Sequence, residues 1–135
     1  MANQRGVRAA LPSITIAVCT RDRLPLLRQC MASVASLWLG GLDVEVLVVD
    51  NGSTDGSTDW LAKWSEAESF HRVVTERRAG LARARNTALA ASTKEVVVFL
   101  DDDALVPAFW ARAHAECLRA ADILAVGGPI RRTWA

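Results

Sequence analysis

Three consecutive aspartates, Asp101, Asp102 and Asp103, follow an almost uninterrupted apolar segment at residues 95–100 (EVVVFL). Adjacent carboxylates repel one another unless a cation neutralises them. On an extended chain, successive side chains point to opposite sides, so Asp101 and Asp103 can converge on one point while Asp102 points elsewhere. Mg²⁺ and Mn²⁺ prefer oxygen ligands and often hold substrate phosphates through one or two carboxylates. The pattern therefore favours an Mn²⁺ or Mg²⁺ site at Asp101 and Asp103 over a solvated acidic turn.

Two further polar clusters directly follow apolar segments that are rich in β-branched residues. Asp50 begins one of them and is placed to accept hydrogen bonds from a ligand; the alternative is a turn or helix cap formed with Gly52 and Ser53. The clusters are Thr20, Arg21 and Asp22 after residues 13–19 (SITIAVC), and Asp50 and Asn51 after residues 44–49 (VEVLVV).

Four arginines, Arg77, Arg78, Arg83 and Arg85, flank Gly80 at the predicted start of a helix. Main-chain N–H groups at a helix start and guanidinium groups both favour anions. A solvated helix face is the simpler explanation for any single arginine. Only the four arginines together indicate a site that binds an anion.

The elements that must position these residues alternate along the chain. Short apolar segments predict strands, and apolar residues at helical spacing, the first set beginning after Pro25, predict helices. This alternation predicts an α/β fold with a mainly parallel, Rossmann-like sheet flanked by helices, in which ligands bind at the carboxyl ends of the strands. We expect a tail at residues 1–12 and one domain at 13–135. The predicted strands are residues 13–19, 44–49, 71–75, 95–100 and 123–126, and the predicted helices are residues 25–37, 57–64, 81–91 and 107–121.

Composition excludes several classes of protein. Of the 135 residues, 51% are hydrophobic, which excludes an intrinsically disordered chain. Sixteen Lys and Arg residues against fifteen Asp and Glu give a net charge of +1, so we expect no nucleic-acid partner. The three distant cysteines argue against a disulfide framework and favour a cytoplasmic location. Neither a signal peptide nor a membrane-spanning segment is expected.

Four ordered motifs resemble those of the family 2 glycosyltransferases. They are residues 16–23 (IAVCTRDR), 48–55 (VVDNGSTD), 80–86 (GLARARN) and 99–104 (FLDDDA), and the last two look like the family's G-x-x-x-A-R-N and D-x-D segments. The resemblance covers residues 13–129, nearly the whole chain. It implies a GT-A fold that binds a nucleoside-diphosphate sugar and transfers the sugar to an acceptor hydroxyl, usually with inversion.

The resemblance also implies roles for individual residues. Thr20 and Asp50 would contact the nucleotide base, Asp102 would reach the ribose, and Asp103 with Asp101 would hold the metal on the diphosphate. Asp50 suits a uracil or thymine edge, so a UDP- or dTDP-sugar is the favoured donor. The candidate nucleotide-sugar-binding residues are Thr20, Arg21, Asp22, Asp50, Asn51, Arg85, Asn86 and Asp102, and the candidate metal ligands are Asp101 and Asp103.

The sequence departs from the family in its last segment. The family's general base lies well downstream of the D-x-D motif, whereas the only carboxylates after Asp103 are Glu116 and Asp122, in a predicted helix and at its end. We therefore expect the donor-binding half of an enzyme, cut before the acceptor half, with the catalytic base unknown. Alone, it would bind metal and nucleotide without transferring sugar, and its uncovered sheet edge would favour self-association.

Other functions compete with this interpretation. One is a non-catalytic module that binds a nucleotide sugar, and another is a nucleotidyltransferase, which usually has a Gly-rich loop where this chain has residues 20–23 (TRDR). A phosphoacceptor receiver domain would need a lysine after a late strand, but the only lysines are Lys63 and Lys94. Because many members of the family act on lipid or polymer acceptors, peripheral action at the cytoplasmic membrane face stays open.

Overall fold

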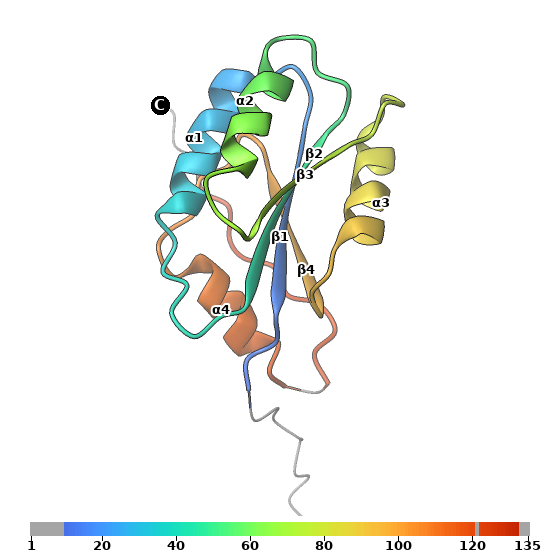
Figure 1. The fold of residues 1–135 in the computed structure, drawn as a ribbon. Coiled ribbons are helices and arrows are strands. Elements are labelled where there is room, and N and C mark those ends of the chain that lie inside the picture. The colour runs from blue at the N-terminus through green and yellow to red at the C-terminus, as the bar shows by residue number, and fades with distance from the viewer. Residues whose placement is uncertain (1–9, 121, 133–135) are drawn as a thin grey trace, which may run out of the picture.

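A parallel sheet in the strand order β3-β2-β1-β4 forms the middle of the molecule (Figure 1). The computed structural model describes residues 10–120 and 122–132. The predicted α/β class and the parallel sheet are confirmed, and the four strands begin and end within one residue of their predicted limits. The strands are β1 (Ile14–Thr20), β2 (Val44–Asp50), β3 (His71–Thr75) and β4 (Val96–Asp101).

Helices cover both faces of the sheet. Figure 1 shows α1, α2 and α4 on one side and α3 on the other. Because side chains alternate along a strand, β1 contributes to both hydrophobic cores: Ile14, Ile16 and Val18 belong to the core on the α1 side, and Ala17 belongs to the core on the α3 side. The helices are α1 (Leu24–Ala35), α2 (Ser57–Ser65), α3 (Leu81–Ala91) and α4 (Trp110–Cys117).

Small side chains bring α3 close to the sheet. Its buried residues are Ala84 and Ala88, and they pack against Ala17, Leu47 and Val49 of the two central strands. α3 begins at Leu81, directly after Gly80, whose φ of 138° is a conformation that favours glycine. This close packing places the first turn of α3 beside the carboxyl ends of β1 and β2.

The last part of the chain differs from the prediction. The expected strand at residues 123–126 is wrong, because residues 123–132 form neither a helix nor a strand, and Leu124 is 94% exposed. An apolar segment becomes a strand only when a neighbouring strand pairs with its main chain. In the described parts of the chain, the sheet ends at β4.

The final helix is also shorter than predicted, ending at Cys117 instead of residue 121. Residue 121, residues 1–9 of the predicted tail and residues 133–135 of the predicted domain lie outside the described residues. Cys19, Cys30 and Cys117 are free thiols, as expected.

Over the ranges 10–120 and 122–132, no helix is both long enough and apolar enough to cross a membrane.

Candidate functional site

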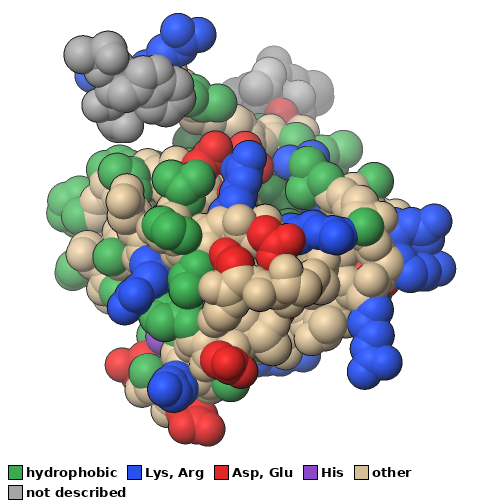
Figure 2. All heavy atoms as spheres, turned by 90° about the horizontal axis from the view of Figure 1, so that it is seen from above, with side chains coloured by type: hydrophobic (Ala, Val, Ile, Leu, Met, Phe, Trp, Pro, Cys, Tyr) green, Lys and Arg blue, Asp and Glu red, His purple; other side chains and the backbone are tan. Residues whose placement is uncertain are grey.

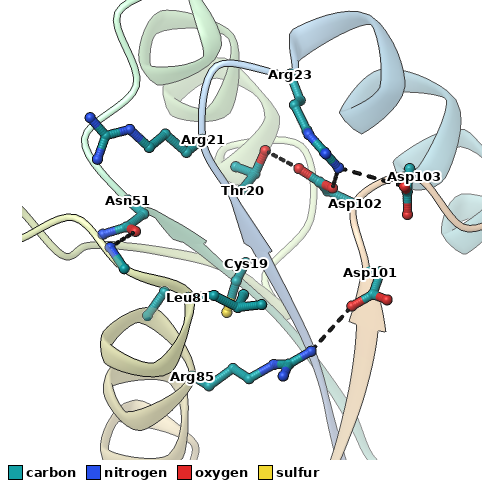
Figure 3. Close-up of a pocket in the computed structure, with 12 residues that line it drawn as sticks. Cys19, Thr20, Arg21, Arg23, Asn51, Leu81, Arg85, Asp101, Asp102 and Asp103 are labelled. Carbon is teal, nitrogen blue, oxygen red and sulfur yellow. Dashed lines mark hydrogen bonds and ion pairs between the residues drawn. The ribbon is translucent and has the colours of Figure 1, made fainter.

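The register of the sheet brings the predicted polar clusters to one edge. Thr20 is the pairing partner of Asp50, and Cys19 is the pairing partner of Asp101, so three strands end together. A pocket of about 440 Å³ opens at this edge (Figure 3). Its lining residues are Cys19, Thr20, Arg21, Arg23, Asn51, Gly80, Leu81, Ala84, Arg85, Asp101, Asp102 and Asp103.

Asp102 is the buried member of the aspartate run. Its Oδ2 accepts a hydrogen bond of 2.9 Å from the Thr20 hydroxyl, and its Oδ1 accepts one of 3.1 Å from Nη1 of Arg23. Both carboxylate oxygens are therefore held, one by the end of β1 and the other by the loop that leads from β1 to α1. These two bonds fix the position of Asp102 directly after β4, which ends at Asp101.

Asp101 and Asp103 contact different arginines. Asp103 Oδ2 lies 3.5 Å from the same Nη1 of Arg23, and Asp101 Oδ1 lies 3.4 Å from Nη2 of Arg85 on α3. Figure 3 shows Asp103 directed toward Arg23 and Asp101 directed toward Arg85. The two side chains predicted to converge on one point thus face opposite sides of the pocket mouth.

Asn51 holds one wall of the pocket. Its Nδ2 donates hydrogen bonds of 2.8 Å to the carbonyl oxygens of Glu76 and Arg78, and its Oδ1 accepts one of 2.9 Å from the Gly80 N–H. A single buried amide therefore fixes the loop between β3 and α3 against the end of β2. Asn51 lines the pocket, as expected for a site residue, but its side-chain bonds are to main chain.

Three predicted site residues, Asp22, Asp50 and Asn86, do not line the pocket. Asp50 is 1% exposed, and its carboxylate accepts hydrogen bonds from the Ser53 N–H (3.0 Å) and the Thr58 hydroxyl (2.6 Å). The bond from the Ser53 N–H is the turn that the sequence offered as one alternative for Asp50, whereas the helix cap is not formed, because the N-cap of α2 is Gly56.

Asp22 connects the loops that follow β1 and β2, because it accepts a hydrogen bond of 2.6 Å from the Thr54 N–H. It adopts a φ of 52°, in the left-handed region that aspartate tolerates better than most residues. Asn86 is exposed on α3.

Arg23 is a charged residue of the pocket that was not among the predicted site residues. It stands at the end of the segments 16–23 (IAVCTRDR) and 20–23 (TRDR) without an assigned role, whereas the structure places its guanidinium beside two of the three aspartates. A signal was present in the sequence: Arg23 comes just before the start of a helix whose first residues include Pro25. Such a helix start lies at the carboxyl edge of a parallel sheet.

The thiols at this edge are unreactive. Burial raises the pKa of Cys19, which lines the pocket, to about 11, and burial together with the charge of Asp102 raises the pKa of Cys30 to about 12. Both cysteines are therefore protonated at neutral pH, which argues against a thiolate nucleophile at this edge.

The carboxylates fit a divalent cation of a particular kind. Within the described ranges, no three His, Cys, Asp or Glu side chains form a cage for a metal ion. Asp101 or Asp103 can instead supply one or two oxygens to a cation that takes its other ligands from substrate phosphates and water, as Mg²⁺ commonly does. Acidic and basic side chains lie next to one another at this edge (Figure 2). The mixture suits a cation and an anion bound together.

Comparisons with known proteins agree with this geometry. The model of glycosyl transferase family 2 matches residues 15–134. Glycosyltransferase AglE of Haloferax volcanii is 26% identical over 127 residues, which cover 93% of this chain and 42% of AglE. Glycosyltransferase GlyA of Streptococcus pneumoniae is 34% identical over 90 residues, which cover 67% of this chain and 13% of GlyA. The chain therefore spans less than half of the length of these relatives.

Solved structures show the same fold. Mannosyltransferase PcManGT from Pyrobaculum calidifontis, in complex with GDP-Man and Mn²⁺, aligns with a TM-score of 0.71 at 30% identity, covering 92% of this chain and 36% of PcManGT. S. aureus TarS in complex with UDP-GlcNAc has a TM-score of 0.65 at 23% identity, over 75% of this chain and 29% of TarS, a likeness of fold. The sheet and its helices correspond to the N-terminal part of GT-A transferases. With the family model matching nearly its whole length, the chain belongs to glycosyl transferase family 2.

Proposed function

We propose that residues 13–135 are the donor-binding half of a GT-A glycosyltransferase. In this proposal they bind a nucleoside-diphosphate sugar with Mn²⁺ or Mg²⁺, and the sugar passes to an acceptor hydroxyl, with inversion at the sugar carbon. One observation carries the proposal: a pocket at the carboxyl edge of the sheet is lined by three aspartates and by three arginines, Arg21, Arg23 and Arg85.

Each side of the pocket has a separate task in this proposal. Asp103 would hold the divalent cation, which would neutralise the charge that develops on the leaving nucleoside diphosphate. Asp101 would share the same cation only after turning away from Arg85. α3 begins at Leu81, which lines the pocket, and the main-chain N–H groups of its first turn favour the phosphates. Thr20 and Asp102 lie on the nucleoside side.

The remaining candidates lie around this centre in the same proposal. Arg21 and Arg85 border the pocket and offer guanidinium groups to the donor. Asp22, Asp50 and Asn51 hold the surrounding loops in place for the nucleotide. Asn86 adds an exposed amide next to Arg85.

The similar proteins support the class of donor without fixing the base. PcManGT was solved with GDP-Man and Mn²⁺, and TarS was solved with UDP-GlcNAc. The base is therefore best found by a panel of UDP, dTDP and GDP.

Thermal melting of the purified chain tests the proposal. We expect one nucleoside diphosphate, in the presence of Mn²⁺, to raise the Tm. At about 100 times its Kd the ligand adds about 2.7 kcal/mol of stability, a rise in Tm on the order of 10 °C for a domain of this size.

Asp103→Asn should remove this rise because it removes a charged metal ligand. The matched control is Asp59→Asn, an exposed aspartate in the first turn of α2, which should keep the rise. If no nucleotide with Mn²⁺ changes the Tm of the unaltered chain, the proposal is wrong.

We also propose that the chain associates with itself through the β4 side of the sheet. Among the described residues β4 is an edge strand of the sheet, and its Phe99 is 38% exposed. Strands at a sheet edge carry main-chain groups that can pair with a second chain. Sedimentation velocity should show a mean mass that grows with protein concentration. A single monomeric species at every concentration up to the highest attainable would contradict this proposal.

A further inference from the structure

Arg23 contacts two of the three aspartates with one nitrogen atom. Its Nη1 lies 3.1 Å from Oδ1 of Asp102 and 3.5 Å from Oδ2 of Asp103. Arg85, by contrast, contacts only Asp101 in this run and also lies over the ring of Phe99, 5.8 Å from its centroid. Arg23 is therefore the arginine that shares a carboxylate with the proposed metal site at Asp103.

The two contacts of Arg23 differ in how firmly they are held. The side chain of Asp102 is 9% exposed, and its other oxygen is bonded to Thr20. The side chain of Asp103 is 51% exposed, and its contact with Arg23 is the longer of the two. Asp102 is thus the fixed partner of Arg23, and Asp103 is the partner that Arg23 can exchange.

We propose that Arg23 couples the binding of the metal to the binding of the diphosphate. The proposal rests on the function proposed above. A divalent cation at Asp103 and the guanidinium of Arg23 compete for the same carboxylate, and two cations at that distance repel each other. The negative diphosphate removes this conflict, because Arg23 turns from Asp103 to a phosphate oxygen while Asp102 still holds its other side. Arg23 is a positioning residue and takes no part in bond breaking.

This arrangement has a consequence for affinities. Coupling between two ligands is reciprocal, so the nucleotide strengthens metal binding by the same factor as the metal strengthens nucleotide binding. Without the Arg23 guanidinium, the metal alone should bind more tightly, and the nucleotide should bind the metal-loaded chain more weakly. An arginine that only stabilised the fold would not change the two affinities in opposite directions.

The test compares Arg23→Gln with Arg28→Gln, an exposed arginine further along α1 that does not line the pocket. Free Mn²⁺ is measured by electron paramagnetic resonance, in titrations with Mn²⁺ alone and with UDP, dTDP or GDP. In Arg23→Gln we expect the Kd for Mn²⁺ alone to fall about tenfold. We expect the nucleotide Kd at saturating Mn²⁺ to rise about tenfold, the effect of one charge-assisted hydrogen bond. Arg28→Gln should match the unaltered chain in both measurements.

Arg23→Lys keeps the proposal testable if Arg23→Gln does not fold. Lysine retains the charge but loses the planar fork, so the coupling between Mn²⁺ and nucleotide should fall to an intermediate value. Two results in a folded variant, Arg23→Gln or Arg23→Lys, would overturn the inference while leaving the proposed donor site intact. One is unchanged coupling between Mn²⁺ and nucleotide, and the other is an equal loss of affinity for both ligands. If the unaltered chain binds no nucleotide with Mn²⁺, the donor site and this inference are wrong together.

Discussion

Replacing Glu45 with glutamine is expected to lower the free energy of unfolding by about 3 kcal/mol. The substitution removes a buried negative charge that accepts four hydrogen bonds. Glu45 is 4% exposed, and its carboxylate accepts hydrogen bonds from Arg72 (2.7 Å), the Thr15 hydroxyl (2.9 Å), the Thr93 hydroxyl (2.8 Å) and the Thr93 N–H (3.2 Å). Arg72 also donates to the carbonyl of Ala91, the last residue of α3. One carboxylate therefore joins β1, β2, β3 and the end of α3.

Urea unfolding measures this loss. Glu66→Gln is the matched control, because Glu66 is an exposed glutamate just after α2, and its replacement should change stability by less than about 0.5 kcal/mol. Glu45 lies at the strand starts, away from the pocket, so the folded Glu45→Gln chain should keep the nucleotide affinity of the unaltered chain. Equal stability of the two variants would contradict the assigned role of Glu45.

The same carboxylate predicts a pH dependence. Burial by itself raises the pKa of Glu45, but the hydrogen bonds from Arg72, Thr93 and Thr15 outweigh it and hold the pKa below its usual value of 4.5. A group with a lowered pKa stabilises the fold fully above its unfolded pKa, and this contribution disappears as the pH falls through the folded value. The stability gap between the unaltered chain and Glu45→Gln should therefore narrow below about pH 4. A gap that stays constant from pH 7 to pH 3 would refute this explanation.

Replacing Asn51 with aspartate should have the second large effect, a loss of about 2–4 kcal/mol in stability together with a loss of nucleotide binding. The substitution keeps the shape of the side chain but replaces the Nδ2 donor with an oxygen. That oxygen faces the carbonyl oxygens of Glu76 and Arg78, which lose their hydrogen bonds of 2.8 Å. The loop that forms one wall of the pocket then loses its attachment to β2.

Hydrogen exchange distinguishes this local effect from general unfolding. In the unaltered chain the Gly80 amide is bonded to Asn51 Oδ1 at 2.9 Å. The substitution Asn51→Asp should increase the exchange rate of this amide more than it increases the exchange rates of the amides at the centre of β1. Asn86→Asp makes the same chemical change on the exposed surface of α3 and should leave both exchange and stability almost unaltered. Similar behaviour of the two variants would show that the Asn51 amide does not hold the loop.

Local patterns predicted the elements well. Residues 81–91 form a helix over the whole predicted range, and β1 and β2 end one residue beyond their predicted ends, at Thr20 and Asp50. Local sequence determines where a buried β-branched strand or an alanine-rich helix begins and ends. Their limits can therefore be predicted from the sequence. The missing strand at 123–126 shows the limit of this reasoning, because a strand also depends on a partner elsewhere in the chain.

The site was predictable in its location but not in its contacts. The three clusters lie at one edge because parallel strands end together, which follows from topology alone. The pairing of Arg23 with Asp102, however, joins residues 79 positions apart, and no local pattern specifies it. The burial of Asp50 was similarly hidden, because it depends on how the loop and α2 fold back over the end of β2.

The strand order has a consequence for how the chain acquires its shape. β1 lies between β2 and β4, so the first strand described pairs with the last one described. The hydrogen bond from Thr20 to Asp102 spans 82 positions. Contacts between distant parts of a chain form slowly, because the entropy cost of closing a long loop precedes the favourable free energy of the contact. We therefore expect β1, β2 and β3 to assemble first and the acidic side of the pocket to appear only when β4 docks, which makes the binding site a late product of folding.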